Sequence, residues 1–219
     1  MPDSSPAPAF TALLFGLSGC LVDFGARTLP IARELSGLAD TEDGFLPILQ
    51  ASAQERAETV PGMDELLEQL NHQQLPCAWL DQLPVTVSAH LASPLPTWIA
   101  AAPRENLRPW PAPDAIWQAL SVLQVQTLEG CVLIASDPDL LQAGLNAGLW
   151  CIGLATCGPL CGLALADWQA LPEQEREHLR AQATLQLYRL GTHSVVDHPG
   201  ELPSCLRDLA HRRLKGEKP

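Results

Sequence analysis

Short apolar runs alternate along this chain with segments whose apolar residues recur at helical spacing. Such alternation is typical of βα units, in which crossover helices join parallel strands. The apolar runs fall at residues 10–15, 76–80, 97–101, 131–135, 150–154 and 194–196, and the helical segments at 62–72, 113–123, 138–147, 173–190 and 202–214. The pattern predicts an α/β fold, a doubly wound parallel sheet with helices on both faces.

Two stretches depart from the alternation. Residues 30–60 are polar and compatible with helix, so we interpret them as a small insertion within a single domain of residues 1–219. Residues 149–166 are nearly uncharged and long enough to suggest a membrane span. They contain Gly153, Gly158 and Gly162, however, and are better explained as a buried strand followed by a loop.

Charge and cysteine content narrow the classes of partner and compartment. The formal net charge of -12 argues against a nucleic acid or a membrane as partner, because both surfaces are negative. Seven cysteines, an odd number, lie on expected strands and loops without the spacing of a zinc site. We therefore expect reduced, buried thiols in a cytoplasmic protein.

The first predicted strand and its following turn carry a motif. Residues 10–25 read FTALLFGLSGCLVDFG, an apolar strand followed by a glycine-containing turn. This segment is similar to the first motif of the haloacid dehalogenase (HAD) superfamily, which in the phosphonoacetaldehyde hydrolase branch resembles D-x-A-G-T-x-x-D-x-G. Gly19, Asp23 and Gly25 match that pattern.

Further segments resemble the same branch, in the same order along the chain. They are RPWP at residues 108–111, GLNAGLW at 144–150, GTH at 191–193 and GEKP at 216–219. The resemblance implies a HAD-like Rossmannoid sheet with a cap after the first strand, here severely reduced to residues 30–60. It also implies a reaction with an Asp nucleophile, a Mg²⁺ ion, a phosphate-binding Arg and a cap Lys that forms a Schiff base.

The residues that would perform this reaction are replaced. Gly16 stands where the nucleophilic Asp belongs, and Ser18 stands two positions later, where the branch has Ala. Ser136 and Leu140 stand at the two acidic positions of the metal motif. We therefore expect no catalytic residue, no bound metal and no other cofactor.

The positions of the lysines in the sequence also bear on the Schiff base. The only two are Lys215 and Lys218, close to the C-terminal end of the sequence, and residues 30–60 contain none. A Schiff base therefore cannot form in a cap made of residues 30–60.

Some groups could still bind an anion. A vestigial anion pocket is expected from Leu17, Ser18, Gly19, Arg108 and Ser136, through backbone N–H groups and one guanidinium. Arg108 could equally be a surface salt-bridge partner, with Glu105 close by in sequence.

Three acids near the expected motifs leave a second hypothesis open. Asp81 follows the second predicted strand, and Asp137 and Asp139 each lie one place from an expected metal ligand. A divergent hydrolase could use these displaced acids, and it would then need Mg²⁺. For Asp137 we prefer a role at the start of a helix.

The leading hypothesis is a phosphonatase-like pseudoenzyme. It would bind an unknown protein partner or a small anionic ligand, and it could form a homodimer.

Overall fold

A single parallel sheet organises the molecule. The structure, a computed structural model, describes residues 10–103 and 106–219. Within these residues the sheet has six strands in the order β3-β2-β1-β4-β5-β6, every neighbouring pair parallel. The strands are β1 (Ala12–Gly16), β2 (Cys77–Leu80), β3 (Ala100–Ala101), β4 (Cys131–Ala135), β5 (Trp150–Leu154) and β6 (Ser194–Val196). The predicted α/β parallel sheet is confirmed.

Both faces of the sheet are covered, because successive side chains of each strand point to opposite sides. In β1, Leu13 and Phe15 join one buried apolar cluster, while Ala12 and Leu14 join another on the opposite face. All five residues of β1 are buried. This double burial explains why the central strands are continuous apolar runs.

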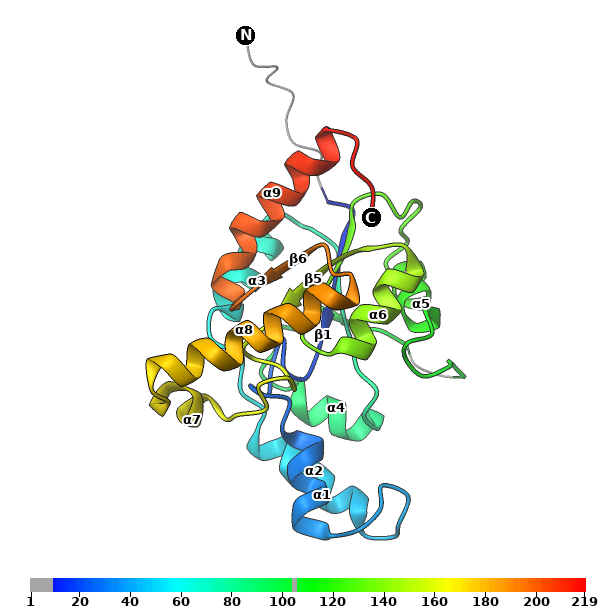
Figure 1. Cartoon of the computed structure of the whole chain (residues 1–219). Helices are drawn as coiled ribbons and strands as arrows, with labels where there is room; N and C mark the ends of the chain where they lie inside the picture. Colours follow the sequence, from blue (N-terminus) through cyan, green and yellow to red (C-terminus); the bar gives the residue numbers. More distant parts are fainter. Residues whose placement is uncertain (1–9, 104–105) are drawn as a thin grey trace.

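Helices pack on each face in a way that matches these two clusters (Figure 1). The first cluster takes side chains from α3 (Met63–His72), α4 (Val85–Leu91) and α9 (Leu202–Leu214). The second takes them from α5 (Asp114–Val122), α6 (Pro138–Ala147) and α8 (Glu173–Leu190). The fold is therefore doubly wound, as predicted.

Glycines end two of the predicted helices. Gly148 (φ 82°) follows α6 and Gly191 (φ 106°) follows α8. Both adopt the left-handed conformation in which glycine carries no steric cost. The predicted helix ends at these glycines are confirmed.

Some predicted bounds were wrong, for local reasons. The strand expected at 97–101 pairs only over Ala100–Ala101, at the edge of the sheet. Two short helices were missed, α4 and α7 (Leu165–Ala170), together with one turn of 3₁₀ helix at Pro199–Glu201. Helices of six or seven residues are too short to show helical periodicity in a sequence window.

Residues 30–60 contain most of a helical pair between β1 and α3. α1 (Thr28–Ser36) and α2 (Phe45–Glu55) lie at one end of the molecule, next to α4 (Figure 1). The Ser52 hydroxyl on α2 donates to the Thr28 carbonyl oxygen on α1 at 2.8 Å, which fixes the two helices against each other. That this pair is the remnant of a cap stays a prediction.

The apolar stretch at 149–166 is divided between β5, a loop and the start of α7. In the described part of the chain, we find no helix with the length and apolar character needed to span a bilayer.

Candidate functional site

The carboxyl ends of β1, β2 and β4 meet at one edge of the sheet, because β1 lies between the other two strands. A cavity of about 440 Å³ lies at this edge, and we call it the sheet-edge cavity. Its lining includes the predicted residues Gly16, Leu17, Ser18, Asp81, Ser136, Asp137 and Asp139, together with Trp110. Ligands commonly bind at this edge of a doubly wound sheet.

The position of Gly16 is sterically narrow. A Cβ atom added there would lie 3.2 Å from Leu140 Cδ2 and 3.4 Å from Ala135 Cβ. Leu140 is buried in the core cluster beneath α6. A side chain at residue 16 would therefore require Leu140 to move.

The turn after β1 uses its own N–H groups. The Leu17 N–H donates to the Leu80 carbonyl oxygen at 2.9 Å, and the Gly19 N–H donates to the Val22 carbonyl oxygen at 2.8 Å. Gly19 has φ 72°, so the left-handed turn lies at this residue. Both N–H groups already have acceptors. They are therefore not free to bind an anion, contrary to the expectation from the sequence.

Asp23 fixes the far side of this turn. Its buried carboxylate accepts hydrogen bonds from the Ser18 hydroxyl at 2.7 Å and from the Arg27 and Thr28 N–H groups at 3.0 Å each. The Asp23 side chain therefore links the turn to the start of α1, and its acceptor sites face protein donors.

Arg108 lies outside the sheet-edge cavity. Its guanidinium donates to both carboxylate oxygens of Asp114, at 2.7 and 2.9 Å, and its side chain is 72% exposed. It lines a neighbouring cavity with Trp110 and Asp81, which line both cavities. Contrary to the expectation from the sequence, Arg108 is therefore not part of an anion pocket in the sheet-edge cavity. Its alternative salt-bridge partner Glu105 falls outside the described residues.

Asp81 and Asp137 have structural hydrogen bonds. Asp81 accepts from the Gln82 N–H at 2.7 Å and from the Ser88 hydroxyl at 2.6 Å, which ties the end of β2 to α4. Asp137 is the N-cap of α6 and accepts from the N–H groups of Asp139 and Leu140 at 2.8 and 3.0 Å. Burial raises the pKa of the Asp137 carboxyl.

Ser136 is enclosed by two glycines. A Cβ on Gly158 would lie 2.2 Å from Ser136 Cβ, and one on Gly19 would lie 2.8 Å from Ser136 Oγ. Ser136 is 1% exposed, and its hydroxyl has no hydrogen-bond partner within the part of the chain that is described. The close approach explains why glycine occupies position 158.

Two functional candidates were missed in the sequence. Arg33 and Asp40 lie in the helical insertion and line the sheet-edge cavity. The Arg33 guanidinium donates to both Asp40 oxygens, at 2.9 and 2.6 Å, and holds the pKa of the Asp40 carboxyl below its usual value. No local motif marks this pair, since the cavity is formed by segments far apart in sequence.

The cavity has an acidic charge balance. Asp40, Asp81, Asp137 and Asp139 line it, and Arg33 is the one Lys or Arg side chain among its described lining residues. Arg33 is already paired with Asp40. The remaining field at this edge is therefore negative.

These side chains do not fit a Mg²⁺ site of the kind that the resemblance implies. Mg²⁺ needs oxygen ligands that are free to coordinate it. Asp81 accepts hydrogen bonds on both carboxylate oxygens, Asp137 accepts two on Oδ1, and Leu140 is apolar. Across residues 10–103 and 106–219, no group of three or more His, Cys, Asp or Glu residues is arranged to hold a metal ion.

Comparison with known proteins identifies relatives of the chain. No family model matches it. It is 27% identical over 187 residues to a phosphonoacetaldehyde hydrolase of Bordetella pertussis, a match that covers 80% of this chain and 65% of that protein. The chain thus spans slightly less than two thirds of that relative's length.

Solved structures share the fold over almost the whole chain. One is 56% identical and covers 96% of this chain and 100% of its own, with a TM-score of 0.84. A phosphonoacetaldehyde hydrolase like protein from Oleispira antarctica is 21% identical, covers 100% of both chains and has a TM-score of 0.86. A HAD family hydrolase from Deinococcus radiodurans, with bound phosphate and sodium, is 22% identical, covers 94% of this chain and 97% of its own, and has a TM-score of 0.63. The chain is thus similar in sequence to phosphonoacetaldehyde hydrolases and shares its fold with haloacid dehalogenase family hydrolases.

Proposed function

We propose that this chain is a phosphonatase-like protein that does not form a phospho-enzyme and acts by binding a partner. The observation that carries the proposal is the contact around Gly16, the position of the family's nucleophile. That residue has no side chain, and Leu140 lies 3.2 Å from the site where a Cβ would begin. A carboxylate is needed there to attack phosphorus.

The lack of a lysine that could form a Schiff base also supports the proposal. We infer that α1 and α2 are the remnant of a cap within one HAD-like domain. Residues 30–60 contain no lysine, so this helical pair cannot form an imine with an aldehyde. The absence of both reactive groups supports a loss of phosphonatase chemistry.

The nature of the partner follows from charge. The acidic sheet-edge cavity disfavours a small anion, since Asp81, Asp137 and Asp139 would repel it. The negative field of the cavity favours a protein partner that presents a basic or neutral side chain over a small anion. Homodimerisation, a cytoplasmic location and the exclusion of nucleic acids and membranes remain parts of the proposal, and the net charge of -12 supports the last of these.

A phosphatase assay tests the proposal. The purified chain is incubated with Mg²⁺ and either phosphonoacetaldehyde or p-nitrophenyl phosphate, beside the Asp81→Asn and Asp137→Asn variants. We expect phosphate release at the rate of the protein-free control in all samples. Turnover by the wild type that either variant abolishes would overturn the proposal, as would a beryllium-fluoride adduct on any Asp.

A divergent hydrolase remains the second candidate. It is favoured by the presence of Asp81, Asp137 and Asp139 in one cavity, and by the burial that raises the pKa of the Asp137 carboxyl. It requires Mg²⁺ at this edge. Calorimetric titration with Mg²⁺ distinguishes the two, because the hydrolase predicts saturable binding that Asp139→Asn weakens, and the pseudoenzyme predicts none.

A further inference from the structure

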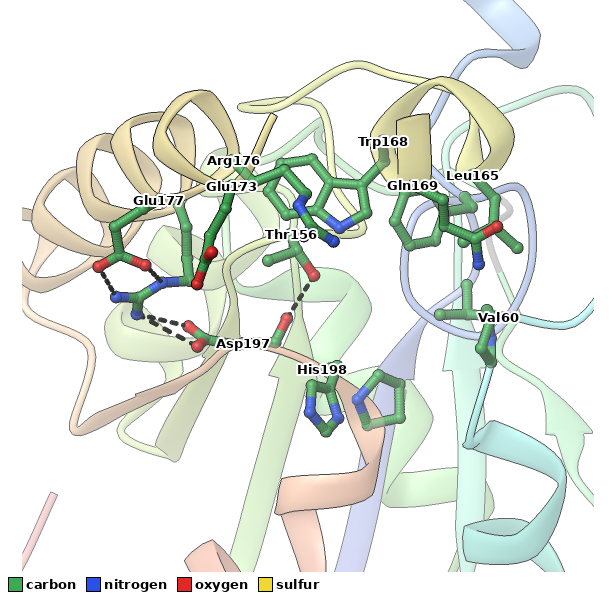
Figure 2. A pocket seen from close by; sticks show the side chains of 14 residues that line it. Val60, Thr156, Leu165, Trp168, Gln169, Glu173, Arg176, Glu177, Asp197 and His198 are labelled. Carbon is green, nitrogen blue, oxygen red and sulfur yellow. Dashed lines mark hydrogen bonds and ion pairs between the residues drawn. The ribbon is translucent and has the colours of Figure 1, made fainter. Parts of the chain in front are cut away.

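A second cavity lies between the ends of β5 and β6 and the helices α7 and α8 (Figure 2). It has a volume of about 460 Å³, which is in the range of small-molecule sites. We call it the α8 cavity. No described residue lines both the α8 cavity and the sheet-edge cavity. Its use would therefore be independent of the family's reaction.

One wall of the α8 cavity is held rigidly and its charges are paired. The Arg180 guanidinium donates to Glu177 and to both oxygens of Asp197, the latter at 3.1 Å each. The Thr156 hydroxyl donates to the Asp197 carbonyl oxygen at 2.6 Å. These bonds connect α8 with the loops after β5 and β6, as the dashed lines in Figure 2 show. This wall is preformed.

Arg176 lies one helical turn before Arg180 and, unlike Arg180, has no carboxylate partner in the part of the chain that the structure describes. Its side chain is half-buried, lines the cavity, and makes no hydrogen bond or ion pair with any described residue. Half-buried Trp168 on α7 also lines the cavity. Figure 2 shows both side chains on the helical side, opposite His198. An unpaired guanidinium and an indole thus line the same open cavity.

The charges around Arg176 define what could bind. Glu173, Glu177 and Asp197 also line the cavity, and Glu177 and Asp197 both pair with Arg180, so that together the three carboxylates outnumber Arg176 and Arg180 by one charge. A ligand with two or more negative charges, such as inorganic phosphate, would be repelled by them. A single carboxylate matches the planar fork of one guanidinium. An indole surface suits a flat, apolar group.

We propose that the α8 cavity binds a small organic acid with one carboxylate and a flat apolar body. The carboxylate accepts hydrogen bonds from the Arg176 guanidinium, and the apolar body packs on the Trp168 indole. The Gln169 amide and the His198 ring also line the cavity and supply polar groups. No covalent step is involved.

Calorimetric titration of the full chain tests this site with phenylacetate as the probe. Phenylacetamide, which has the same shape without the charge, and inorganic phosphate serve as comparison ligands. We expect saturable binding of phenylacetate with a dissociation constant of roughly 1 mM or tighter. Phenylacetamide and phosphate should each bind at least about tenfold more weakly, since a hydrogen bond to a charged group contributes about this factor.

Two variants on the same helix separate the site from general charge effects. Arg176→Gln should weaken phenylacetate binding about tenfold or more. Arg189→Gln, an exposed position outside the cavity, should leave binding unchanged. In the wild type, saturating phenylacetate should shift one indole N–H resonance, the one missing from Trp168→Phe.

Several results would overturn the proposal. They are no saturable binding of phenylacetate, equal binding by Arg176→Gln, stronger binding of phosphate, or a shift confined to other indoles. The resonance shift, assigned through Trp168→Phe, and the loss of binding in Arg176→Gln are separate readouts, so either one decides the matter if the other variant fails to fold. None of these results depends on whether the sheet-edge cavity is catalytic.

Discussion

Leu140 Cδ2 lies 3.2 Å from the place where a Cβ on Gly16 would begin. The two residues come from β1 and α6, which meet at the carboxyl edge of the sheet. Leu140 is also one of the two residues that the sequence resemblance places at the acidic positions of the metal motif. A larger residue 16 and the present Leu140 would compete for the same volume.

A double-mutant cycle tests that competition. Gly16→Ala should lower the free energy of unfolding by about 1–2 kcal/mol, because Leu140 must shift to admit the Cβ. In a Leu140→Ala background the same change should cost less by about 1 kcal/mol. Urea unfolding of the four proteins measures the coupling. Additive effects would show that the two side chains do not compete.

The Gly16→Asp variant extends the test to activity. A carboxylate at residue 16 alone should produce no phosphatase turnover, since Ser136 and Leu140 provide no acidic ligand for Mg²⁺. The assay is phosphate release with Mg²⁺ from p-nitrophenyl phosphate. Turnover in this single variant would mean that the displaced acids can hold the ion.

Asp81 ties the end of β2 to α4 through a hydrogen bond from Ser88. The Ser88 side chain is fully buried, and its hydroxyl donates to Asp81 Oδ2 at 2.6 Å. Ser88→Ala should lower the free energy of unfolding by about 1–3 kcal/mol, because a buried carboxylate loses a donor. Thr86→Ala, at an exposed position on the same helix, should change it by less than about 0.5 kcal/mol. Urea unfolding compares them, and equal effects would argue against a role for the Asp81–Ser88 bond.

The close contact between Gly158 and Ser136 can be tested with a pair of compensating substitutions. Gly158→Ala should lower the free energy of unfolding by about 3 kcal/mol, because its Cβ would lie 2.2 Å from Ser136 Cβ. Adding Ser136→Gly removes that atom and should recover at least about 1 kcal/mol of the loss. Thermal and urea unfolding report both effects. If the second substitution recovered nothing, the clash would lie elsewhere.

The strands and the main helices could be predicted from the sequence, because buried parallel strands are continuous apolar runs and glycines end α6 and α8. That Gly16, Asp81 and Ser136 each lie at or just after the end of a strand could also be predicted. The pairings at the site could not. Arg108 pairs with Asp114, and Arg33 reaches the cavity from an insertion with no motif. Such contacts depend on how segments distant in sequence pack together.

The bounds of β3 and the α8 cavity could not be predicted either. The β3 strand pairs over two residues, too few to set its bounds from an apolar run. The α8 cavity combines Trp168, Arg176 and Asp197, which lie on two helices and a loop after β6. Neither spacing nor composition relates these residues. Only the topology brings them together.

His193 is expected to make stability depend on pH. Its Nδ1 accepts the Cys151 N–H at 3.0 Å, so this nitrogen must be unprotonated. Burial, and then the charge of Arg212, lower the pKa of His193 below its ordinary value. The neutral ring therefore stabilises the fold fully above the ordinary histidine pKa. That stabilisation is lost as the pH falls from there through the lowered pKa, because the unfolded chain takes up the proton first.

Urea unfolding at about pH 7.5 and about pH 5.5 measures this dependence. The free energy of unfolding should be lower at the acidic pH in the wild type. His193→Asn places a neutral acceptor near Nδ1 and should reduce the difference between the two pH values. His211→Asn, at an exposed position on α9, should leave the difference unchanged. If His193→Asn retained the full acid sensitivity, the titrating group would have to be another residue.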